Sequence, residues 1–142
     1  MEKQLVIRDM SDWSDRENGT KVLYAILAEG ETAIATAKLL HKTEYGENVF
    51  CVSFIDVRPE ERKKGNARTL LNLVAEKKGY ILASSGGYTP EGYAAFKDFP
   101  LLPGKVHLGK PSYDSMDFIQ DWGVQDEWVS CPEIYGTEII PA

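Results

Sequence analysis

The feature that most constrains the fold is an apolar run followed directly by a basic, glycine-containing turn and a helical pattern. Residues 49–55 are apolar on both faces, which is typical of a strand buried in the middle of a sheet. After Gly65 the apolar residues change period and fall on one helical face: Ala67, Leu70, Leu71, Val74 and Ala75. Lys77, Lys78 and Gly79 provide a cationic last turn and a glycine stop. The sequence therefore predicts a buried strand that leads through a turn into a helix.

A turn of this kind can bind an anion. The first backbone N–H groups of a helix have no partner within the helix, and the helix dipole favours negative charge there. Cationic side chains surround the point: Arg62, Lys63, Lys64 and Arg68. We expect a phosphate-binding turn; the alternative is a solvated charged turn that only connects a strand to a helix.

The charge balance limits the kind of ligand. The chain has 16 Lys and Arg residues against 22 Asp and Glu residues, a net charge of -6, yet five of the 16 cations lie between Arg58 and Arg68. Local positive charge on an acidic background favours one anionic ligand. It argues against broad binding of nucleic acid, which normally needs a basic face.

The turn also resembles a known family. Residues 62–67 match the Arg/Gln-x-x-Gly-x-Gly/Ala signature of the GNAT superfamily of N-acetyltransferases, and residues 57–61 are similar to its Val-x-Pro-x-x lead-in. With the order of strands and helices, the resemblance extends over about two thirds of the chain. In that family the backbone amides of this turn hold the pyrophosphate of acetyl-CoA. The resemblance therefore implies acetyl-CoA as cosubstrate, bound by Ile55, Val57, Arg62, Lys63, Lys64, Gly65, Asn66 and Ala67.

The fold implied by the resemblance is a single α/β domain over residues 1–142, with a mixed, mostly antiparallel sheet, a central parallel pair of splayed strands and flanking helices. Strands are expected at residues 5–8, 21–28, 32–40, 49–55, 80–85, 105–108 and 133–140, and further helices at 90–99 and near 116–122. Residues 32–40 are alanine-rich and fit a helix equally well, but Gly30 after a strand-like run favours a hairpin. Residues 11–20 leave room for little more than one helical turn, so the N-terminal helical region is short.

The function implied is transfer of an acetyl group from acetyl-CoA to a primary amine of a small molecule or protein. Such a reaction needs a base for the ammonium group and an acid for the departing thiolate. The base could be Asp56, Glu47 or a water relay, because Cys51 stands where some family members have glutamate. For the acid we favour Tyr93, with Tyr88 in reserve. The family's usual tyrosine position holds Phe96, which has no proton to give.

The alternative function is a non-catalytic module that keeps the acyl-CoA fold and acts through a protein partner. The expected partners are acetyl-CoA and an amine acceptor, and the chain could also form a homodimer. We expect no nucleic acid and no metal, since no second histidine or cysteine lies at metal-ligand spacing from His41.

We also expect no membrane span, since no apolar run approaches the roughly 20 residues that a span requires. The first residues lack the apolar core of a signal peptide, and Cys51 and Cys131 suggest buried thiols, so we expect a cytoplasmic protein.

Overall fold

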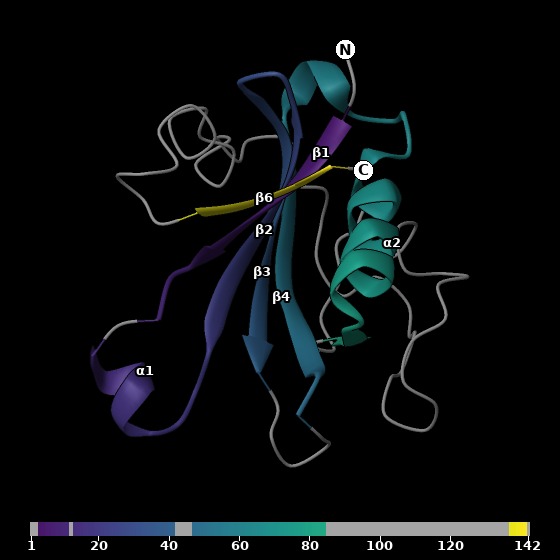
Figure 1. The fold of residues 1–142 in the computed structure, drawn as a ribbon. Coiled ribbons are helices and arrows are strands. Elements are labelled where there is room, and N and C mark those ends of the chain that lie inside the picture. Colours follow the sequence, from purple (N-terminus) through teal and green to yellow (C-terminus); the bar gives the residue numbers. More distant parts are fainter. Residues whose placement is uncertain (1–2, 12, 42–46, 85–136, 142) are drawn as a thin grey trace.

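The computed structural model describes residues 3–11, 13–41, 47–84 and 137–141 (Figure 1). In chain order the elements are β1 (Lys3–Asp9), α1 (Trp13–Glu17), β2 (Val22–Glu29), β3 (Thr32–His41), β4 (Val49–Val57), the 3-10 helix η2 (Pro59–Glu61), α2 (Asn66–Lys78), β5 (Ile81–Ser84) and β6 (Thr137–Pro141). The described strands form one six-stranded sheet in the order β5-β4-β3-β2-β1-β6.

The sheet is mixed. Every neighbouring pair is antiparallel except β4 and β5, which are parallel and joined by the crossover helix α2. The predicted α/β class with a mixed, mostly antiparallel sheet is therefore confirmed. The parallel pair was expected to be central, whereas in the described part of the sheet β5 is an edge strand.

The hairpin of β2 and β3 decides between the two readings of the alanine-rich segment. Thr32–His41 is a strand hydrogen-bonded on both sides, to β2 and to β4, so the expectation of a strand is confirmed. Gly30 has a φ of 62° and is the first of two turn residues, whereas the sequence suggested a turn at Glu29 and Gly30, one position earlier. Two flanking partners outweigh the helix preference of alanine, because ladder hydrogen bonds and packing are worth more than propensity.

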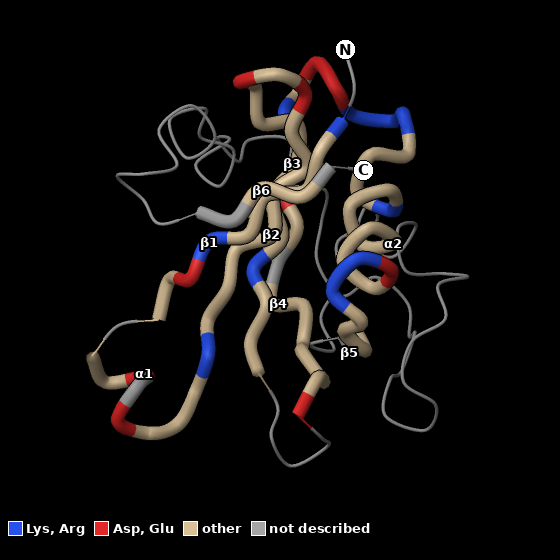
Figure 2. Tube along the Cα trace, in the orientation of Figure 1, with Lys and Arg blue, Asp and Glu red and all other residues tan. Residues whose placement is uncertain are grey.

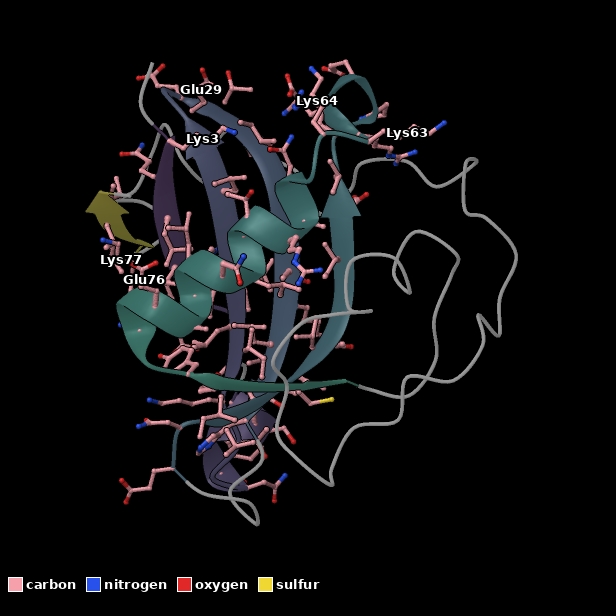
Figure 3. All side chains as sticks on the ribbon, turned by 90° about the vertical axis from the view of Figure 1, so that its right-hand side faces the viewer. Lys3, Glu29, Lys63, Lys64, Glu76 and Lys77 are labelled. Carbon is pink, nitrogen blue, oxygen red and sulfur yellow. The ribbon has the colours of Figure 1, made fainter. Side chains whose placement is uncertain are left out.

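Helix α2 covers one face of the sheet, as Figure 1 and Figure 3 show. Its Leu70, Leu71 and Val74 are fully buried and pack against alternate residues of the strands, among them Leu27 and Leu39. The intervening residues form what we call the second face, with an apolar cluster of Val6, Ile26, Ala28 and Ala33 beside Tyr24. Because side chains alternate between the two faces and both faces carry buried apolar clusters, the strands contain runs of consecutive apolar residues.

Helix α1 and strand β6 agree with the elements predicted from the sequence. Helix α1 has five residues, which confirms the expectation of about one turn between the first two strands. Strand β6 overlaps the second half of the predicted late strand 133–140, ends one residue later and pairs with β1. The described helices include none long and apolar enough to cross a bilayer. The helices expected at 90–99 and 116–122 and the strand at 105–108 lie outside the described residues.

Candidate functional site: a turn that can hold an anion

The turn between β4 and α2 has the backbone geometry of an anion-binding site. Gly65 adopts the left-handed conformation (φ 77°, ψ 15°) directly before α2 begins at Asn66 in the right-handed one. Successive residues of opposite hand turn their N–H groups toward one concavity, the arrangement called a nest. A Cβ atom at Gly65 would meet no atom within 4 Å, so the concavity is open on the side of this residue.

The N–H groups at this turn are available to a ligand. Within the described chain, the first backbone bond of the helix runs from the N–H of Thr69 to the carbonyl of Gly65 (3.0 Å), and no side chain caps the helix. The N–H groups of Gly65, Asn66, Ala67 and Arg68 find no acceptor among the described residues. We call these four donors the cradle. The dipole of a 13-residue helix adds to their attraction for an anion.

The cationic side chains of the turn divide into two groups. Figure 2 shows Lys and Arg gathered on the segment that leads into α2. Lys63 is exposed, and Figure 3 shows its side chain directed away from the sheet. Neither Lys63 nor Arg68 has an ion-pair partner among the described residues, whereas the exposed Lys64 Nζ lies 3.4 Å from Glu61 Oε2. Lys63 and Arg68 are therefore the cations best able to respond to a bound anion.

Two predicted cofactor-binding residues use their side chains inside the protein. Arg62 donates from Nε to the carbonyl of Val57 (2.9 Å), and its Nη2 lies 3.7 Å from Asp56 Oδ1. The buried Asn66 donates from Nδ2 to the carbonyl of Glu61 (2.9 Å), and its Oδ1 accepts from Lys3 Nζ (3.4 Å). These side chains hold the turn in shape, so Asn66 would reach a ligand through its backbone N–H.

Sequence reasoning missed Lys3 and the role of Arg58. The backbone N–H of Arg58 bonds the carbonyl of Ile34 (2.9 Å), and its Nε bonds that of Ala33 (2.8 Å). Arg58 thus fixes the end of β4 to β3, and Lys3 on β1 contacts Asn66 at the start of α2. No local pattern could have found these contacts, because they depend on the register of the sheet.

The edge of β4 beyond Val52, which has no partner strand in the described part of the chain and is called the free edge below, can accept an extended ligand. The N–H of Arg58 points to β3, so alternation turns the backbone groups of Val57 and Ile55 to the opposite edge. Among the described residues, β5 pairs only with Val49–Val52 and no strand pairs with β4 beyond them. Ser53 is an extra residue in the register of β4 with β3, a bulge that bends a strand where pairing ends. Ile55 and Val57 thus face an edge next to the cradle.

The candidate bases lie at opposite ends of β4. Asp56 is buried (7% exposed) and stands opposite Thr36 on the second face, where its Oδ1 lies 3.7 Å from Nη2 of Arg62. Glu47 precedes Asp56 by nine residues, about 30 Å of extended strand, and its carbonyl oxygen lies 2.6 Å from His41 Nε2. Of the two, Asp56 is the one that contacts the turn between β4 and α2, through Arg62. Tyr93 and Tyr88 lie outside the described residues.

Two other sequence expectations concern this region. Cys51 is buried, as predicted, and stands opposite Leu40, while Cys131 lies outside the described residues. In the described ranges no three His, Cys, Asp or Glu side chains come together to hold a metal ion. Comparison of the chain with protein-family models, with curated proteins and with solved structures found no match.

Proposed function

We propose that the protein is a GNAT-type N-acetyltransferase that transfers an acetyl group from acetyl-CoA to a primary amine. The observation that carries this proposal is the cradle at Gly65 to Arg68. It combines a left-handed glycine, four N–H donors without acceptors in the described chain and a sequence that matches the family signature. A pyrophosphate is the ligand that this combination suits best, since it is anionic and accepts several hydrogen bonds.

The proposed position of the diphosphate in the cradle determines where the rest of acetyl-CoA would lie. With the diphosphate at the start of α2, the pantetheine arm extends back along the free edge of β4. Its amides can pair there with Ile55 and Val57 as an added strand would. The bulge at Ser53 supports the splayed strands that the family resemblance implies, because it follows directly on the last described parallel pair, Val52 with Ser84.

The chemistry needs two proton transfers. The neutral amine attacks the thioester carbonyl, the C–N bond forms and the C–S bond breaks. Of the two protons that the ammonium loses, one passes to solvent and one ends on the sulfur of CoA. Asp56 is the base that we propose and Tyr93 the acid.

The ion pair with Arg62 gives Asp56 a second role to test, as an anchor for the turn. Asp56→Asn separates the two roles. Loss of a base should lower kcat by about a hundredfold or more at unchanged KM for acetyl-CoA, whereas loss of an anchor should lower stability and CoA affinity together.

A thiol-release assay with acetyl-CoA over pooled small amines and lysine peptides tests the activity, and mass spectrometry of the intact protein tests for bound CoA. We expect amine-dependent release of CoA that Gly65→Glu abolishes. Absence of both CoA binding and thiol release would remove the proposal.

The second candidate is a non-catalytic module that binds acyl-CoA and acts through a protein partner. One observation favours it: two carboxylates that contact the turn, Asp56 and Glu61, both lie beside cations, Arg62 and Lys64. This candidate predicts CoA binding without thiol release from any amine in the pool.

A further inference from the structure

A row of polar side chains crosses the second face beside the bulge of β4. The register places Arg8, Tyr24 and Lys38 directly opposite one another on β1, β2 and β3, and Lys38 opposite position 54 of β4. Tyr24 packs against the apolar cluster of the second face, so its cross-strand neighbours lie on that face too. Adjacent members of such a row have Cβ atoms about 5 Å apart. The row therefore ends one residue from Ser53.

The row is cationic. Lys38 is half-buried on an inner strand and has no ion pair or hydrogen bond to any residue that the structure describes. Arg8 brings a second positive charge close to the Tyr24 hydroxyl. Burial raises the pKa of Tyr24, and the charge of Arg8 acts in the opposite direction. Lysine is seldom buried without a counter-ion, so the half-buried Lys38, with the positive charge of Arg8 in the same row, favours an anionic ligand.

A buried hydroxyl group on the same face also favours a bound polar molecule. Thr36 lies two residues before Lys38 on the same face of β3, opposite Asp56. Its side chain is fully buried, and Oγ1 has no hydrogen-bond partner among the residues that the structure describes. Buried polar groups are nearly always hydrogen-bonded, so this hydroxyl calls for a polar atom that a bound molecule would supply.

We infer that Arg8, Tyr24, Lys38 and Thr36, which we call the acceptor row, bind the amine substrate, and that this substrate carries a carboxylate as an amino acid does. The inference rests on the proposed acetyltransferase function. The cations would hold the carboxylate, and Tyr24 and Thr36 would donate hydrogen bonds to its oxygen atoms. The same cations disfavour a protonated amine nearby, so they keep the acceptor nitrogen in its nucleophilic form. A diamine would bring a second ammonium against two cations and is disfavoured.

Two series of acceptors test this inference in the thiol-release assay: amino acids from glycine to aminohexanoate, and diamines of matching length. We expect kcat/KM to be at least about tenfold higher for the amino acids. Lys38→Met should raise their KM about tenfold or more and leave the KM for acetyl-CoA unchanged, and Lys38→Glu should favour the diamines. Lys21→Met is the matched control, since it removes an exposed cation next to β2 and should change neither KM.

A second variant tests the same inference if the Lys38 substitutions prevent folding. Thr36→Val removes only the hydroxyl, so we expect a higher KM for amino acids together with an unchanged or higher melting temperature. If catalysis is absent but CoA binds, amino acids and not diamines should raise the melting temperature of the CoA complex.

Preference for diamines in either readout, or no response to any amino acid, would refute binding of the amine substrate by the acceptor row. It would not affect the proposed acetyl-CoA site. Failure to bind CoA would overturn both.

Discussion

Gly65 and Gly79 offer a matched pair of substitutions at the two ends of α2. Both have left-handed φ angles, 77° and 69°, and at both an added Cβ would meet nothing within 4 Å. Alanine in this conformation costs about 1–2 kcal/mol, and part of that is offset because alanine restricts the unfolded chain by about 0.4–1 kcal/mol. We therefore expect Gly65→Ala and Gly79→Ala each to lower the free energy of unfolding by about 1 kcal/mol, or roughly 3 °C in Tm.

The two variants should differ only in ligand binding. Gly65 belongs to the cradle, so a methyl group there would stand beside N–H groups that would meet the diphosphate, whereas Gly79 lies at the far end of the helix. Isothermal titration with CoA should show at least a tenfold loss of affinity for Gly65→Ala, about 1.4 kcal/mol, and none for Gly79→Ala. Thermal unfolding of both proteins provides the control. Equal CoA affinity in the two variants would refute the placement of the diphosphate at the cradle.

Two more predictions concern stability. Lys63 has a φ of 61°, which strains the backbone of a residue other than glycine. Lys63→Gly should therefore raise the free energy of unfolding in urea by about 1 kcal/mol, while Lys64→Gly should lower it. Equal effects of the two substitutions would show that the backbone at Lys63 is not strained. The pKa of Tyr24 is raised by burial, with Arg8 opposing, so above about pH 10 the folded protein keeps a proton that the unfolded chain has lost, and stability should fall as the pH rises. Tyr24→Phe should reduce that decline, and parallel alkaline profiles in the two proteins would count against it.

The sequence predicted the parts of the fold that local patterns encode. The apolar run before the basic turn, the change to a helical period after Gly65 and the stop at Gly79 correspond to β4, α2 and its left-handed end. The alanine-rich segment of β3 was ambiguous because propensity and pairing disagree there, and the two neighbouring strands decide the outcome. The bulge at Ser53 has no local signal, since it appears only when β4 is paired with β3.

The candidate site was predictable where it depends on the backbone. A glycine before a helix start places N–H groups toward a ligand whatever the surrounding side chains do. The side chains of Arg62 and Asn66 looked like ligand contacts in sequence, but they bind Val57, Asp56 and Glu61, because the turn folds back on the end of β4. The acceptor row could not be found from spacing, since its members come from three strands and only the register aligns them.

The central claim is that the cradle binds the diphosphate of acetyl-CoA, and a CoA titration of the unmodified protein monitored by thermal unfolding tests it most directly. A ligand that binds only the folded state at a hundred times its Kd adds about 2.7 kcal/mol of stability. At roughly 2–4 °C per kcal/mol this corresponds to a rise in Tm of roughly 5–10 °C that grows with the logarithm of CoA concentration. We predict that rise for CoA and acetyl-CoA and none for pantetheine, which lacks the diphosphate. An unchanged Tm up to millimolar CoA, or an equal rise with pantetheine, would contradict the claim.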